Sequence, residues 1–164
     1  MHLATGKHPH PLDPLTAQEI NEVRRVLVEE GLLSDTARVA YLGLEEPPKG
    51  EVLAYEDAAP PARRARAFLL DLATETAEDV IVSISGGRVE ERRPIDPVTD
   101  GQVPMLDEEH ALVRQVLRED AGWAEALARR GITDPASVYL AALSAGHFGL
   151  PRRRAAGWPG CWRT

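Results

Sequence analysis

A capped amphipathic helix followed by a strand, in residues 10–46, most constrains what this chain can fold into. Its sequence is HPLDPLTAQEINEVRRVLVEEGLLSDTARVAYLGLEE. Thr16 and Glu19 have the spacing of a capping box, in which each side chain accepts a hydrogen bond from the other residue's backbone N–H. Gly31 then supplies the positive φ that commonly ends a helix. Between them, Ile20, Val23, Val26 and Leu27 recur at helical spacing and predict one apolar face.

The same helix recurs ninety positions later in the chain. Six residues of the first helix are repeated in order, as Glu109, Val113, Arg114, Val116, Leu117 and Glu119. A predicted strand follows each helix, at residues 38–44 and 137–143, because both stretches are short and rich in β-forming side chains. The repeat predicts an α+β fold made of two helix-on-antiparallel-sheet units, of which the second is incomplete.

Turn residues divide the rest of the chain into predicted elements. We expect a turn at 47–50, a short strand at 51–55, a loop at 58–62, a strand at 79–85, a two-residue turn at Gly86-Gly87 and a returning strand at 88–95. Propensity favours a helix at 63–76, whereas alternation favours a strand. Further on, we expect Asp107 to cap the second helix, a helical stretch at 121–130 ending at Gly131, and a turn at Asp134-Pro135.

Composition excludes several classes of function. Apolar residues make up 43% and charged residues 27% of the 164 residues, which is ordinary for a soluble globular protein. The net charge of −7 argues against non-specific binding to nucleic acid, and no apolar run is long enough to predict a membrane span. A single cysteine and an N-terminus without the apolar core of a signal peptide lead us to expect a cytoplasmic protein.

Both ends of the chain differ from the middle. His8 and His10 form an H-x-H pair that could ligate a metal, but a pair without further ligands rarely makes a closed site, so a mobile arm at 1–9 is the favoured interpretation. Residues 151–164, PRRRAAGWPGCWRT, contain four arginines and no acidic residue. They are either a basic tail for acidic partners or, as we prefer, the product of an altered reading frame in a GC-rich gene.

Several separated segments resemble the N-terminal part of the copper-containing, topaquinone-dependent primary amine oxidases. HPLDPLTAQEI, RVAYLGLEEPPKG, VPMLDEEHALVRQVL and ALSAG-x-F carry the resemblance in order, over about residues 9–148. It implies two small cystatin-like domains, called N2 and N3 in that family, here at 10–95 and, in part, 105–150, with a linker at 96–104. The resemblance also implies that residues 63–76 are a strand.

The family oxidises primary amines to aldehydes and releases ammonia and hydrogen peroxide. Its members are homodimers, and their copper and topaquinone lie in a large C-terminal domain that these segments do not resemble. Tyr41, Tyr55 and Tyr139 lack the Asn-Tyr-Asp/Glu motif of a quinone precursor, and His8 and His10 do not match copper ligands. We therefore expect no catalytic residue, no metal ligand and no cofactor in this chain, which would be a non-catalytic fragment.

Two other functions remain to be weighed. A free-standing cystatin-like interaction module would explain the first unit but not the incomplete second one. An independent enzyme lacks a recognisable constellation, since Cys161 lies in the unusual tail.

The resemblance also suggests candidate site residues. It places His110, Ala142 and Leu143 near the mouth of the substrate channel of the intact enzyme, where a positive charge on His110 would oppose entry of an ammonium substrate. The alternative is that Leu143 is a core residue and His110 is solvated in the first turn of a helix.

Overall fold

The computed structural model describes residues 10–55 and 62–143, which form two compact units, within 1–103 and 104–164. Three predicted features lie largely or wholly outside the described residues: the arm at 1–9, the loop at 58–62 and the tail at 151–164.

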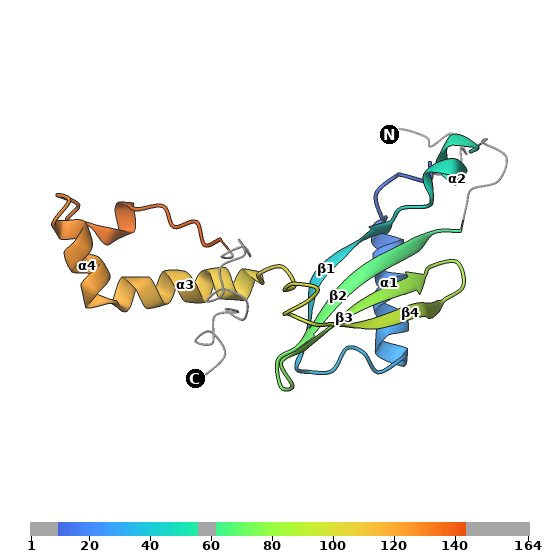
Figure 1. The fold of residues 1–164 in the computed structure, drawn as a ribbon, viewed down its shortest axis with the longest axis horizontal. Helices are drawn as coiled ribbons and strands as arrows, with labels where there is room; N and C mark the ends of the chain where they lie inside the picture. The colour runs from blue at the N-terminus through green and yellow to red at the C-terminus, as the bar shows by residue number, and fades with distance from the viewer. Residues whose placement is uncertain (1–9, 56–61, 144–164) are drawn as a thin grey trace. The chain divides into compact units, whose positions relative to one another are not determined.

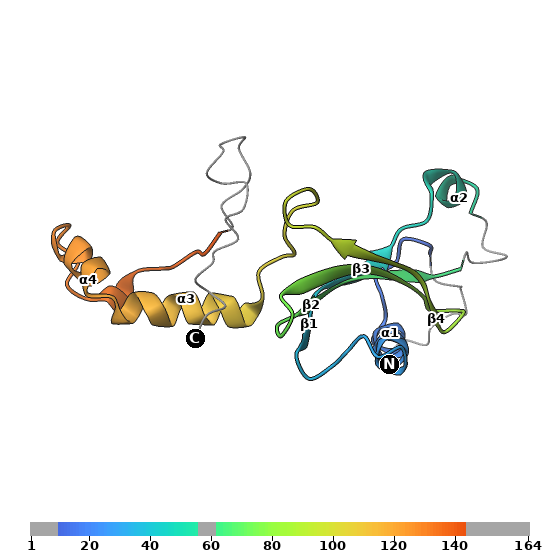
Figure 2. The same ribbon diagram turned by 60° about the horizontal axis from the view of Figure 1, so that its bottom comes forward.

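The first unit is a four-stranded antiparallel sheet with one long helix on one face (Figures 1 and 2). The strands follow one another in chain order across the sheet: β1 (Ala37–Glu45), β2 (Arg64–Asp71), β3 (Thr76–Ser83) and β4 (Arg88–Ile95). The helix is α1 (Ala17–Glu29), and a short helix, α2 (Lys49–Leu53), lies between β1 and β2. The predicted α+β class is confirmed.

The predicted capping box is present at the start of α1. The Thr16 hydroxyl accepts a hydrogen bond from the Glu19 N–H at 3.2 Å, and the Glu19 carboxylate accepts one from the Thr16 N–H at 2.8 Å. These bonds satisfy two backbone donors that the first turn of a helix leaves free. Gly31, with a φ of +70°, ends the helix as predicted.

The core of the first unit lies between α1 and the middle strands. Val23, Val26 and Leu27 are at most 1% exposed, and alternate residues of the sheet meet them: Ala65, Ala67, Leu69, Val80 and Val82. Ile20, expected in the same stripe, is 41% exposed and lies at its margin.

A buried ion pair fastens the N-terminal segment and α1 to the sheet. Arg63, which is 8% exposed just before β2, donates to both carboxylate oxygens of Glu19, at 2.5 and 3.3 Å. It also donates to the backbone carbonyls of His10, Asp13 and Pro14. One guanidinium therefore satisfies carbonyls of the N-terminal segment and holds the capping residue of α1 in place.

Several predicted boundaries in the first unit need correction. Residues 49–53 are helical, where a turn at 47–50 and a strand at 51–55 were predicted, because the Pro48 carbonyl accepts from the N–H groups of Glu51 and Val52. Within 63–76, residues 64–71 are a strand, but 72–75 turn the chain so that β3 can begin at Thr76. The turn after β3 takes four residues, 84–87, instead of the two expected.

The second unit contains helices and, within the described residues, no strand. It consists of α3 (Asp107–Glu119), α4 (Ala121–Ala128) and a 3₁₀ turn, η1 (Pro135–Ser137). Its described residues bury only Leu106 and Leu127, and α3 itself has no buried residue. Val116, which repeats the buried Val26, is 55% exposed.

Two predictions for the second unit are wrong. Asp107 is the first residue of α3 and not its cap; extended Leu106 precedes the helix, and the Glu109 carboxylate accepts the Leu106 N–H at 2.7 Å. Residues 137–143 are not a strand. A strand needs a hydrogen-bonding partner, and no described segment of this unit offers one; Tyr139 is 91% exposed.

We expect Leu27→Ala to cost roughly 2–5 kcal/mol of unfolding free energy, because it leaves a cavity between α1 and the sheet. Thr16→Ala should cost only about 1 kcal/mol, since it removes one capping hydrogen bond. Urea melts followed by far-UV circular dichroism would measure both. The reverse order of the two losses would show that the stripe is not the main buried face.

The Arg63–Glu19 pair should make stability depend on acid. Burial by itself would raise the pKa of the Glu19 carboxyl, but hydrogen bonds from Arg63 and Thr16 outweigh it and hold that pKa below its usual value. A lowered folded-state pKa stabilises the fold above the unfolded-state pKa, and the contribution is lost as pH falls through the folded-state pKa. Arg63→Met should therefore cost roughly 3–5 kcal/mol at pH 7 and progressively less on acidification.

Urea melts at about pH 7, 5 and 3.5 would measure how the difference in unfolding free energy between wild type and Arg63→Met decreases with pH. Arg64→Met is the matched control, since Arg64 is the neighbouring arginine and makes no side-chain hydrogen bond or ion pair in the described structure. A stability gap between wild type and Arg63→Met that stays constant with pH would contradict the assignment.

Candidate functional site

The structure places the three predicted channel-mouth residues in the second unit. His110 is half-buried in the first turn of α3, where its backbone N–H donates to the Leu106 carbonyl at 3.2 Å. Ala142 is half-buried, and Leu143 is 84% exposed, so it is not a core residue here. No hydrogen bond, ion pair or ring contact in the described structure joins His110 to the other two.

The described half of the His8/His10 pair has a local structural role. The His10 Nδ1 accepts a hydrogen bond from the Leu12 N–H at 3.2 Å, and its ring meets Tyr55 edge-on, with 5.4 Å between the ring centroids. His8 lies outside the described residues. Among the residues that the structure describes, no group of three or more His, Cys, Asp or Glu side chains could hold a metal ion.

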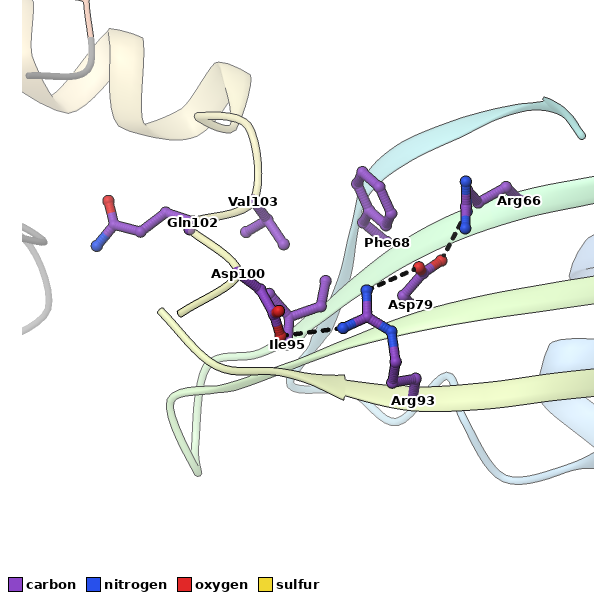
Figure 3. Close-up of a pocket in the computed structure, with 9 residues that line it drawn as sticks. Arg66, Phe68, Asp79, Arg93, Ile95, Asp100, Gln102 and Val103 are labelled. Carbon is purple, nitrogen blue, oxygen red and sulfur yellow. Dashed lines mark hydrogen bonds and ion pairs between the residues drawn. The ribbon is translucent and has the colours of Figure 1, made fainter. Parts of the chain in front are cut away.

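The most organised polar cluster in the described structure lies on the sheet face opposite α1. Residues at alternate positions of the strands point to this face, which brings Arg66, Asp79 and Arg93 together from β2, β3 and β4. Asp79 accepts from Arg66 Nε at 2.9 Å and from Arg93 at 3.3 Å, and Arg93 also donates to Asp100 at 3.0 Å (Figure 3). We call these four residues the ion-pair cluster.

A shallow pocket of about 230 Å³ lies beside the ion-pair cluster. Phe68, Ile95 and Val103 supply its apolar wall, and the segment that follows β4 borders it (Figure 3). On the same face, the ring of Tyr41 in β1 packs against Phe68, with 5.2 Å between the ring centroids. The pocket thus joins an aromatic patch to a row of paired charges.

In the ion-pair cluster, the two arginines balance the charges of the two aspartates. The hydrogen bond to Asp79 raises the pKa of the Arg66 guanidinium, and a nearby Glu45 carboxylate, at 3.5 Å, adds to the effect. Asp79 is only 6% exposed, and a carboxylate so buried is stable when it is paired and hydrogen-bonded. The residues lining the pocket include no serine, cysteine, histidine, lysine or tyrosine, and its two carboxylates, Asp79 and Asp100, are paired with guanidinium groups.

Sequence reasoning did not find the ion-pair cluster. In the run Glu90 to Arg93 all four residues are exposed, and two of them make ion pairs across the sheet: Arg92 with Glu78 and Arg93 with Asp79. The available signal was Asp79 itself, an acidic residue at the start of the apolar stretch VIVSI. Its partners depend on strand register, which a local pattern does not give.

Comparison with known proteins assigns the first unit. Residues 16–92 match the model of the AGAO-like N2 domain. The match includes α1 and strands β1 to β3 entirely, and most of β4. The first unit is therefore an AGAO-like N2 domain.

Characterised amine oxidases match most of this chain. It is 47% identical over 139 residues to histamine oxidase from Arthrobacter globiformis, 31% identical over 140 residues to copper methylamine oxidase from Arthrobacter sp. (strain P1), and 26% identical over 145 residues to primary amine oxidase from Klebsiella aerogenes. These matches cover 85%, 85% and 87% of the chain but only 20%, 21% and 18% of the relatives. The chain therefore spans about a fifth of their length.

The match to the N2 domain includes part of the ion-pair cluster. Arg66 and Asp79 lie inside the matched residues 16–92, whereas Arg93 is the next residue after them and Asp100 follows β4. Side chains of opposite charge that neutralise one another fit a structural role on the sheet surface.

Proposed function

We propose that this chain provides non-catalytic N-terminal domains of a copper- and quinone-dependent primary amine oxidase. The 47% identity to a histamine oxidase over 139 residues carries the proposal. Residues 105–150 would be part of the N3 domain that follows N2. The reaction served would be the oxidation of a primary amine to an aldehyde, with ammonia and hydrogen peroxide as products. The intact enzyme would be a homodimer.

The interactions of the clustered carboxylates support a non-catalytic role. The clustered carboxylates are paired with guanidinium groups, and the described residues offer no three-ligand metal site. Copper and topaquinone would belong to other parts of such an enzyme. A cytoplasmic location is part of the proposal and rests on the single cysteine.

The chain by itself should form no quinone and oxidise no amine. Incubation with copper in air, followed by addition of a primary amine, should give neither the visible absorbance of a quinone nor hydrogen peroxide. A full-length copper amine oxidase treated in parallel is the positive control. Peroxide that depends on both copper and amine would overturn the non-catalytic assignment.

The channel-mouth residues should influence substrate choice more than turnover. We propose that His110, Ala142 and Leu143 shape access to the active site of the intact enzyme. Residues 10–143 of this chain would replace the matching region of the A. globiformis histamine oxidase, and His110→Phe and Leu143→Ala would be made in that chimera. Each should change the ratio of kcat/KM for a bulky aromatic amine to that for a small aliphatic amine by about threefold or more.

Arg114→Ala is the matched control, because Arg114 is exposed on α3 and lies one turn beyond the half-buried His110. It should leave the ratio unchanged. If the ratio also stays unchanged in His110→Phe and Leu143→Ala, with quinone formation intact, the channel-mouth proposal is wrong, while the family assignment is untouched.

A further inference from the structure

We propose that residues 96–103 are a strap fastened to the sheet of the first unit by Asp100, so that the joint between the two units is confined to Pro104 and Met105. The sequence led us to expect a linker throughout 96–104, which would let the chain bend at any of those residues. The strap is a property of the chain itself and does not depend on the reaction of the intact enzyme.

Asp100 closes the first part of the strap into a compact turn. Its carboxylate accepts a hydrogen bond from the Asp96 N–H at 3.0 Å, and its own N–H donates to the Asp96 carbonyl at 2.8 Å. The Asp96 carboxylate accepts another from the Val98 N–H at 2.7 Å. Gly101 follows with a φ of +92°, which glycine adopts without strain, and redirects the chain. The turn is therefore held by hydrogen bonds to its own backbone.

The Asp100 carboxylate also ties this turn to the sheet. Arg93 donates to Asp100 at 3.0 Å and to Asp79 at 3.3 Å, so its guanidinium lies between two carboxylates (Figure 3). Asp79 is buried and is also held by Arg66. An exposed ion pair usually contributes little, because fixing two long side chains costs entropy. Here Asp79 already orients Arg93, so less entropy is lost when Asp100 binds to it.

Apolar packing holds the far end of the strap. Val103 is half-buried and lines the same pocket as Phe68 of β2 and Ile95 of β4 (Figure 3). Gly101 and Gln102 also border this pocket. The chain therefore runs along the sheet face away from α1 before it leaves the first unit, which ends at Val103.

The second unit begins almost immediately after the strap. Leu106 is 8% exposed, and its N–H donates to the Glu109 carboxylate at 2.7 Å, which fixes the start of α3. Only Pro104 and Met105 lie between Val103 and Leu106. The ring of Pro104 fixes its own φ and restricts Val103 to extended conformations. The joint therefore has few freely rotating bonds and should act as a short hinge instead of a free linker.

Backbone ¹⁵N relaxation on the full chain would test the proposal through the order parameters of the strap. In wild type, they should stay near the value of rigid backbone, about 0.85, as far as Val103. Asp100→Ala removes the hydrogen bonds from Arg93 and from the Asp96 N–H together. It should therefore lower the order parameters of residues 98–102 below about 0.6, the range of flexible backbone.

Thr99→Ala is the matched control, because Thr99 is next to Asp100 in the strap and its side chain makes no hydrogen bond in the described part of the chain. It should leave the order parameters unchanged, and those of β3 would verify that the sheet stays folded in each variant. Flexible values at residues 98–102 in wild type, a strap that stays rigid in Asp100→Ala, or an equal loss of order in Thr99→Ala would each overturn the proposal.

Discussion

The packing of three α1 side chains against a sheet lined with alanine is the contact on which the first unit depends. Val23, Val26 and Leu27 are almost completely excluded from water, and they meet Ala65 and Ala67 across the interface. A helix can cover only part of a four-stranded sheet, so the rest of the sheet must be stabilised in other ways. The Arg63–Glu19 pair fastens α1 to the residue before β2, and the ion-pair cluster links β2, β3 and β4 on the face away from α1.

On the face away from α1, ion pairs between charged side chains stabilise the sheet. Asp79 is buried in the middle of the sheet, where an unpaired carboxylate would be costly, and two arginines from the neighbouring strands neutralise it. The long aliphatic stems of such arginines also cover apolar surface while their charged groups reach water. Ile81, at 6% exposure, lies buried on this face, opposite Arg66 in the register of β2 and β3.

The second unit repeats the helix of the first without, in its described residues, the sheet that buries it. Val116 and Leu117 stand where Val26 and Leu27 stand in the first unit, yet none of the α3 residues is buried. The comparison separates the two sources of helix stability. Capping interactions and propensity suffice to shape α3, but a hydrophobic stripe contributes to stability only when another element covers it.

Sequence alone determined the local structure of this protein and its family. The Thr16–Glu19 capping box, the stop at Gly31 and the return strand at 88–95 all follow from interactions within a few residues, and they are present in the structure. Tertiary structure decided whatever depends on partners distant in sequence. It determined the strand register that brings Arg66, Asp79 and Arg93 together. It also determined the ion pair between Arg63 and Glu19, which are far apart in the sequence. In the described residues, 137–143 do not form a strand. The physical reason is that a strand or an ion pair is completed by a second segment, whose position no local pattern encodes.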